Sequence, residues 1–161
     1  MKTLYILRHG KSSWDHVGMS DYDRPLLKKG ESRTQKVSKF LEKSKLIPDL
    51  IISSPAKRAK QTAKIIAKEL NKPMVYDDNL YPGNSLSILD SVYSIDNEIN
   101  SAMIVGHNPG LTTVVRELMD NDLDWLPTSG LAVGQWETDK WNEIALMRPK
   151  EVKIIIPKQI T

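Results

Sequence analysis

"LYILRHG", residues 4–10, runs four apolar residues directly into an arginine, a histidine and a glycine. An apolar run of this length predicts a buried β-strand over residues 2–7. Arg8 and His9 then fall at the carboxyl end of that strand, and Gly10 lets the backbone turn or approach a ligand closely. In open α/β sheets, ligands bind at the carboxyl ends of the strands. The stretch therefore predicts an α/β fold and the sheet edge that carries its site.

Strand and helix patterns alternate through most of the chain. Further strands are expected over 49–54, 73–77 and 101–106, and helices over 26–45, 54–70, 86–95 and 110–119, with Ser54 as the cap of the second helix. The alternation predicts a three-layer α/β sandwich, a mostly parallel central sheet flanked by helices. Residues 130–147 are expected to form a C-terminal β-hairpin that turns near 138–140.

The length, net charge and cysteine content of the chain exclude several classes of protein. The length of 161 residues fits a single domain over 1–161, and a net charge of +3 is too slight to indicate a nucleic-acid partner. The absence of cysteine excludes disulfides and thiolate chemistry. The short apolar run at the start is cut by Arg8, so we expect neither a signal peptide nor a membrane segment, and a cytoplasmic location.

Two other expected strand ends also carry cationic side chains. Arg58 falls in the first turn of the helix after strand 49–54, and His107 follows strand 101–106 directly. Alone, Arg58 is one more cation on a lysine-rich helix, and His107 is an ordinary loop histidine. In a parallel sheet, however, both converge with Arg8 and His9 on one edge, where helix N-termini also favour anions. Such a cluster suits a compact dianion such as phosphate.

Three motifs in this order resemble the histidine phosphatase superfamily, whose fold is that of phosphoglycerate mutase. They are "RHG" (8–10), "SSPxxRAxQTA" (53–63) and "GHNPGL" (106–111). The stretches "DYDRPLLKKG" (21–30) and "LPTSGLAV" (126–133) look more closely like its small SixA-type phosphohistidine phosphatases. The resemblance spans roughly residues 2–148.

The resemblance implies a covalent mechanism. His9 would attack phosphorus and carry the phosphoryl group until water removes it. Around it, the resemblance implies a catalytic and phosphate-binding set of Arg8, Arg58 and His107, with further phosphate contacts from Gly10, Ser12 and Asn108. No metal or other cofactor is expected, because the cations hold the transferring group.

The expected substrate is a protein that carries phosphohistidine, with inorganic phosphate as product and neither nucleic acid nor membrane as partner. The alternatives are a small-molecule phosphomonoesterase and an inactive phosphate-binding module. Ester-cleaving members usually carry a carboxylic acid where this chain has Tyr81 or Asn108. Carboxylates left open as a hidden acid are Asp15, Asp21, Asp23, Asp77 and Asp78. An imidazole leaving group needs far less help from an acid than an alkoxide does.

Overall fold

The computed structural model describes residues 1–14 and 18–160, which form one six-stranded sheet and four α-helices. The strands are β1 (Lys2–Arg8), β2 (Leu50–Ser53), β3 (Met74–Tyr76), β4 (Ser101–Gly106), β5 (Leu131–Trp136) and β6 (Glu151–Ile155). The helices are α1 (Lys28–Lys43), α2 (Lys57–Leu70), α3 (Ser85–Tyr93) and α4 (Gly110–Leu118). Of the helices described, none has both the length and the apolar character that crossing a membrane requires.

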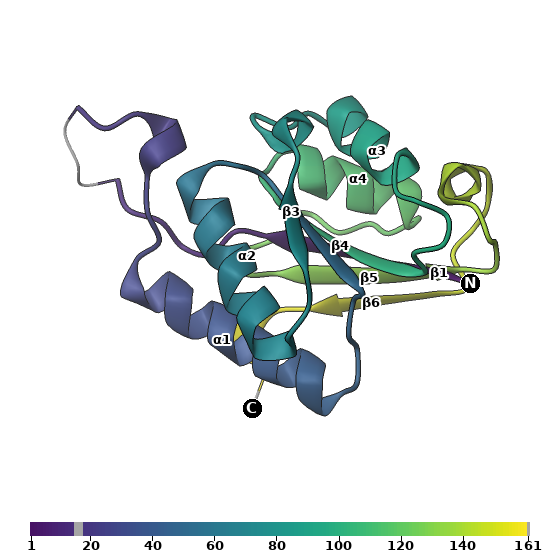
Figure 1. Ribbon diagram of the computed structural model, residues 1–161, viewed down its shortest axis with the longest axis horizontal. Coiled ribbons are helices and arrows are strands. Elements are labelled where there is room, and N and C mark those ends of the chain that lie inside the picture. Colours follow the sequence, from purple (N-terminus) through teal and green to yellow (C-terminus); the bar gives the residue numbers. More distant parts are fainter. Residues whose placement is uncertain (15–17, 161) are drawn as a thin grey trace.

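The sheet confirms the expected mostly parallel architecture. Its strand order is β3-β2-β4-β1-β5-β6, in which β1 to β4 run parallel and β5 is antiparallel to both of its neighbours. Val105 of β4 pairs with Leu7 of β1 on one side and with Ser53 of β2 on the other. The three strands therefore end at the same edge, the left-hand edge in Figure 1.

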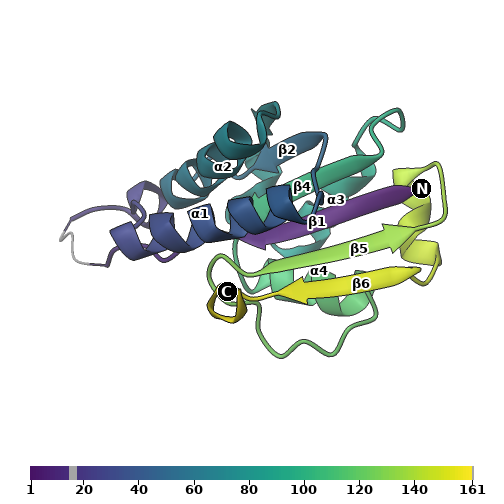
Figure 2. The same cartoon turned by 90° about the horizontal axis from the view of Figure 1, so that it is seen from below.

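Helices cover both faces of the sheet, α1 and α2 on one side and α3 and α4 on the other (Figure 2). Successive residues of β1 serve the two faces in turn: Leu4 and Ile6 pack in the core under α3 and α4, and Tyr5 and Leu7 pack under α1 and α2. A strand that is buried on both faces reads as a continuous apolar run, which explains the opening stretch of the sequence.

The C-terminal hairpin differs from the prediction. β5 pairs in antiparallel fashion with β6, whereas residues Trp141–Leu146 form a 3₁₀ helix between the two strands. Trp141 and Ile144 are fully buried, and the Trp141 indole N–H donates to the Ile99 carbonyl at 2.9 Å. The apolar residues of this segment therefore face the core at a spacing of three, as in a 3₁₀ turn, and not at the spacing of two that a strand requires.

The start of α2 also lies later than predicted. The helix begins at Lys57 with Ala56 as its cap, two residues after the expected capping residue Ser54. The Ser54 hydroxyl does accept a hydrogen bond from the Ala56 backbone N–H at 3.2 Å, but it lies before the helix and faces the site. Arg58 stays in the first turn, as the sequence predicts.

Candidate active site

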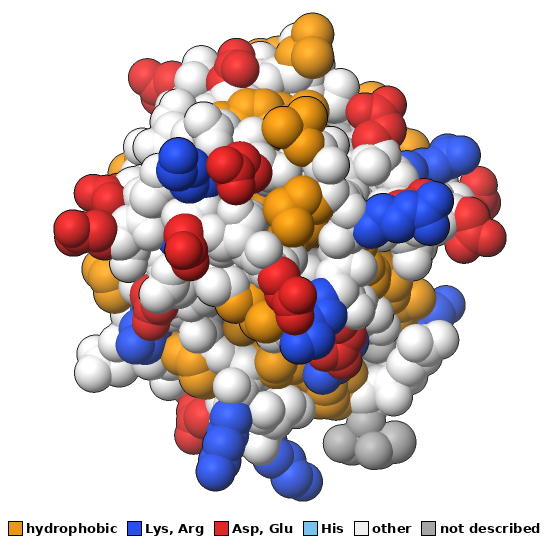
Figure 3. Space-filling view, turned by 90° about the vertical axis from the view of Figure 1, so that its right-hand side faces the viewer, with side chains coloured by type: hydrophobic (Ala, Val, Ile, Leu, Met, Phe, Trp, Pro, Cys, Tyr) orange, Lys and Arg blue, Asp and Glu red, His pale blue; other side chains and the backbone are white. Residues whose placement is uncertain are grey.

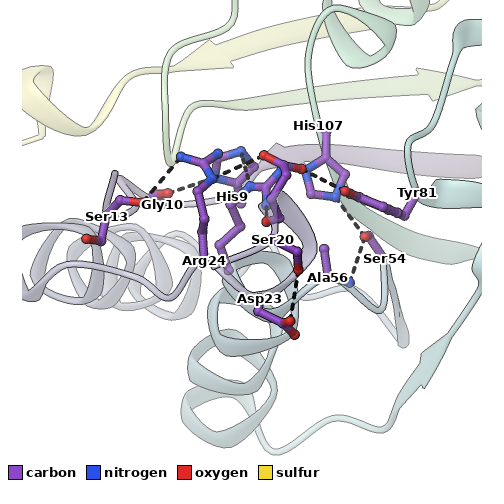
Figure 4. Close-up of polar contacts among 12 residues, drawn as sticks. His9, Gly10, Ser13, Ser20, Asp23, Arg24, Ser54, Ala56, Tyr81 and His107 are labelled. Carbon is purple, nitrogen blue, oxygen red and sulfur yellow. Dashed lines mark hydrogen bonds and ion pairs between the residues drawn. The ribbon is translucent and has the colours of Figure 1, made fainter. Parts of the chain in front are cut away.

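A pocket of about 570 Å³ lies at the sheet edge where β1, β2 and β4 end. The four predicted catalytic side chains all line it, and Ser12 and Asn108 line it as well. The structure therefore brings together residues that lie up to a hundred positions apart in the chain. Figure 4 shows the two histidines of this group side by side, with Tyr81, Arg24 and Ser54 around them.

His9 is held as a neutral imidazole whose Nε2 carries no proton. Its Nδ1 lies 2.7 Å from the Gly10 carbonyl, and because a carbonyl only accepts, Nδ1 is the nitrogen that carries the proton. Burial lowers the pKa of His9 to about 3, and the charges of Arg58 and Arg8 act in the same direction. The Nε2 lone pair accepts a hydrogen bond from Arg58 Nε at 3.3 Å. His9 thus has the tautomer that a nucleophile requires.

Gly10 does not line the pocket, and its polar groups are already used. Its N–H donates to the Thr62 hydroxyl at 3.0 Å, while its carbonyl accepts from His9. A Cβ on Gly10 would lie 2.9 Å from the Gly30 carbonyl oxygen, and one on Gly30 would lie 2.3 Å from the Lys11 carbonyl oxygen. The two glycines therefore allow the chain after β1 to lie against α1, which fixes the position of His9.

Arg58 is buried and makes a bidentate contact with Asp21. Its Nη1 donates to the Asp21 backbone carbonyl at 2.7 Å, and its Nη2 donates to the Asp21 carboxylate at 3.0 Å. Asp21 belongs to a short 3₁₀ helix, Asp21–Asp23, in the loop between β1 and α1. The arginine that the sequence assigns to phosphate is therefore bound here by a carboxylate of the same chain.

Asp21 is ionised in this arrangement. Burial on its own would raise its pKa, but hydrogen bonds from Tyr81 and Arg58 and the charge of Arg24 outweigh burial, so the pKa lies below the usual value. The Tyr81 hydroxyl donates to the carboxylate at 2.7 Å, and Arg24 Nε donates at 3.1 Å. A carboxyl group in this state accepts hydrogen bonds and has no proton to give.

His107 is oriented by Ser54. The Ser54 hydroxyl lies 2.7 Å from Nε2 of the ring, and the His107 and His9 ring centroids are 5.2 Å apart. Nδ1 of His107 is buried and has no hydrogen-bond partner among the described residues. Burial lowers the pKa of His107 to about 3, and the charge of Arg58 adds to this effect. Nδ1 is therefore a polar atom that a ligand in the pocket would satisfy.

Arg8 and Asn108 both donate to the Leu126 carbonyl, Arg8 through Nη1 at 3.2 Å and Asn108 through Nδ2 at 2.8 Å. Arg8 Nε is buried without a partner among the described residues, which leaves it free for an anion. The Asn108 side-chain oxygen, in contrast, accepts from the Thr112 N–H and hydroxyl at 3.0 and 2.8 Å. The Asn108 side chain thus connects the start of α4 to the loop at Leu126.

Among the described acidic residues, Asp21 alone lines the pocket. Asp23 accepts a hydrogen bond from Ser20 at 2.8 Å, and Asp77 accepts one from the Asn79 N–H at 2.9 Å. Asp78 is exposed and lies in the 3₁₀ turn that follows Asp77. Asp15 lies outside the described residues. No three His, Asp or Glu side chains gather as metal ligands would in the part of the chain that the structure describes.

Sequence reasoning missed three features of the site: the Asp21–Arg58 pair, the stacking of Arg24 on Trp14, and the position of Ser129. The Arg24 guanidinium lies 3.5 Å from the centroid of the Trp14 ring. The Ser129 N–H donates to the Arg8 and His9 carbonyls, at 3.1 Å each, and so holds the end of β1 against the turn that precedes β5. The stretches at 21–30 and 126–133 include Asp21, Arg24 and Ser129, but of these only Asp21 had an expected role, as a candidate acid, and Trp14 lies outside both stretches.

Comparisons with known proteins agree with this geometry. A family model described as "Histidine phosphatase superfamily (branch 1)" matches residues 4–81. An uncharacterized chloroplastic protein of Arabidopsis thaliana is 31% identical over 154 residues, which covers 88% of this chain and 70% of the plant protein.

Two solved structures are similar over most of the chain. A "putative phosphohistidine phosphatase SixA" from Agrobacterium tumefaciens is 33% identical, with a TM-score of 0.77 over 83% of this chain and 90% of that chain. A protein histidine phosphatase SixA complexed with tungstate is 22% identical and shares the fold, with a TM-score of 0.83 over 99% of both chains.

Proposed function

Because the chain belongs to the histidine phosphatase superfamily, we propose that it is a phosphatase that removes the phosphoryl group from phosphohistidine on a protein. The observation that carries the proposal is the state of two side chains in one pocket. The His9 imidazole is neutral with its Nε2 lone pair free of a proton, and the Asp21 carboxyl group is ionised. The pocket thus has a nucleophile, but its described acid has no proton to give.

In the first step, His9 Nε2 attacks phosphorus, and the bond between phosphorus and the substrate's imidazole nitrogen breaks. That nitrogen keeps the bond's electron pair and takes a proton from solvent. In the second step, water attacks the phosphoryl group on His9, the N–P bond breaks, and inorganic phosphate leaves. Arg8, Arg58 and His107 Nδ1 hold the oxygens, where negative charge is spread during in-line transfer.

The leaving group separates phosphohistidine from phosphate esters. An alkoxide leaves poorly without a proton, and a general acid typically contributes about 10²–10⁴-fold. An imidazole takes a proton readily near neutral pH, since its reference pKa is about 6.5. With Asp21 ionised by its bonds to Tyr81, Arg58 and Arg24, the pocket is suited to the leaving group that needs no acid.

A phosphomonoesterase is the second candidate, and the position of Asp21 favours it. A phosphoryl dianion that takes over Arg58 would remove one of the contacts that hold Asp21 as a carboxylate and would add negative charge beside it, so the pKa of Asp21 would rise. In that case Asp21 would donate a proton to an ester oxygen. This function predicts efficient turnover of alkyl phosphates and a loss of that turnover in Asp21→Asn.

The test compares two peptides of one sequence, one carrying phosphohistidine and one carrying phosphoserine at the same position. We expect kcat/KM for phosphohistidine to exceed that for phosphoserine by at least about a hundredfold. The activity should survive exhaustive chelation of metal ions, and His9→Ala should remove it. Equal values for the two peptides would favour the phosphomonoesterase, and no release from either would identify an inactive binding module.

A further inference from the structure

The pocket is larger than the phosphoryl group it is proposed to hold. Its volume of about 570 Å³ corresponds to the space of roughly twenty water molecules at about 30 Å³ each. A phosphoryl group and the imidazole that carries it fill only part of this space. The remainder contacts other parts of the substrate, so its chemistry indicates what surrounds the phosphohistidine.

The lining carries more positive charge than a phosphoryl group neutralises. Among the described residues, its charged members are one carboxylate, Asp21, and five cations: Arg8, Lys11, Arg24, Arg33 and Arg58. The two lining histidines are neutral. These side chains leave four positive charges, and a phosphoryl dianion neutralises two of them. Two positive charges therefore remain in the occupied pocket.

The ion pairs of the pocket identify the side chains that carry the two remaining positive charges. Arg24 and Arg58 both pair with Asp21, and Arg8, which precedes His9 in the chain, has a buried Nε without a partner among the described residues. Lys11 is exposed and Arg33 is half-buried, and neither has an acidic partner within residues 1–14 and 18–160. Within the described part of the chain, Lys11 and Arg33 are thus the lining cations that neither a carboxylate nor the phosphoryl group neutralises.

Exposed tryptophans lie beside the arginines of the pocket. Trp14 is 78% exposed and stacks on Arg24, and Trp125 is 51% exposed with its ring 5.9 Å from the Arg8 guanidinium carbon. Tryptophan and arginine are the residues most enriched where proteins bind one another. The opposite end of the molecule differs, because acidic and basic side chains are interspersed across it (Figure 3).

We propose that the outer part of the pocket recognises acidic side chains that flank the phosphohistidine on the partner protein, through Lys11 and Arg33, with Trp14 as the apolar contact. This inference rests on the proposed function and names the partner's chemistry: a phosphohistidine set in an acidic surface. Complementary charge of this kind raises the rate of encounter and selects among partners more than it adds affinity.

The test uses two phosphohistidine peptides of one sequence, flanked on each side of the phosphohistidine by glutamate or by glutamine. For the wild-type enzyme we expect kcat/KM to be about fivefold higher with glutamate, mainly through KM, and the preference to shrink as salt is raised. The double variant Lys11→Gln, Arg33→Gln should lose the preference. Turnover of phosphoramidate, which has no flanking groups, should be unchanged in that variant.

The matched control is Lys36→Gln, Arg116→Gln, which removes two exposed cations outside the pocket and should keep the preference. Equal cleavage of both peptides by the wild-type enzyme would refute acidic recognition and leave the proposed function standing. An equal loss on phosphoramidate in Lys11→Gln, Arg33→Gln would show that the two cations serve the phosphoryl group itself, which also refutes it. If the wild type cleaves neither peptide, the proposed function fails.

Discussion

Asp21 competes with the substrate for Arg58, so replacing its carboxylate should strengthen the binding of phosphate. In the free enzyme, Asp21 accepts from Arg58 Nη2 at 3.0 Å and from Arg58 Nη1 through its backbone carbonyl at 2.7 Å. A phosphoryl dianion must share or displace the first of these contacts. Asp21→Asn keeps the shape of the side chain and the backbone contact, but removes the negative charge that faces the incoming anion.

The magnitude follows from the exposure of the pair. Two unit charges about 4 Å apart interact with about 1 kcal/mol in water and about 4 kcal/mol near a protein surface. The Asp21 side chain is 47% exposed, so the lower part of this range applies. About 1.4 kcal/mol corresponds to a tenfold change, and we therefore expect Asp21→Asn to lower the Kd for inorganic phosphate roughly tenfold.

Isothermal titration with phosphate at neutral pH measures this effect directly. Asp23→Asn is the matched control, because Asp23 belongs to the same 3₁₀ helix, accepts a hydrogen bond from Ser20 and lies outside the pocket lining. The Kd of Asp23→Asn should equal that of the wild type. Unchanged binding in Asp21→Asn would refute competition, and weaker binding would show in addition that the carboxylate holds Arg58 in its binding position.

Three further predictions concern the nucleophile, the histidine ionisations and the close contact at Gly30. His9→Ala should abolish turnover and leave the circular dichroism spectrum unchanged. Acid-labile phosphate trapped on the wild-type enzyme should map to His9. Phosphate found on another residue would reassign the nucleophile. The free energy of unfolding should fall as the pH drops from about 6.5 toward 3. The reason is that the unfolded chain then protonates His9 and His107, whereas the folded chain keeps both neutral until about pH 3. Urea titrations at neutral and acid pH measure this fall, and His107→Gln should make it smaller. Gly30→Ala places a Cβ 2.3 Å from the Lys11 carbonyl oxygen and should cost about 1–3 kcal/mol of stability in urea titration. Gly106→Ala, whose Cβ would lie 3.6 Å from the Leu111 side chain, should cost clearly less, and equal losses would contradict the contact at Lys11.

Much of the candidate site was predictable because the apolar and polar patterns of short segments indicate where the strands end and how they connect. Each of the four predicted catalytic residues comes at or shortly after the end of a short apolar run: Arg8, His9, Arg58 and His107. Parallel pairing of the strands alone brings such positions to one edge of the sheet. The pairing of Asp21 with Arg58 has no such pattern, since it depends on where the 3₁₀ helix Asp21–Asp23 lies relative to the start of α2.

The misplaced hairpin and helix start have a related cause. Trp141 and Ile144 are apolar in a segment that reads as a strand, yet the indole N–H of Trp141 finds its acceptor only when the segment turns inward. Ser54 reads as a helix cap, and its hydroxyl is instead used by His107. In both cases a polar atom's partner lies in a distant part of the chain, which local patterns do not record.

The pairing of β1 with β4 and of β4 with β2 also determines where the chain tolerates changes of length. Side chains alternate between the two faces of a strand, so one residue added or removed within β4 would exchange the residues that pack under α1 and α2 with those that pack under α3 and α4, and would shift His107 relative to His9. The long connection between β5 and β6 carries no such constraint, because both strands are paired independently of its length. Insertions for tags or reporters therefore belong on either side of the 3₁₀ helix Trp141–Leu146, between residues 137 and 140 or between residues 147 and 149, at the end of the sheet away from the pocket (Figure 1).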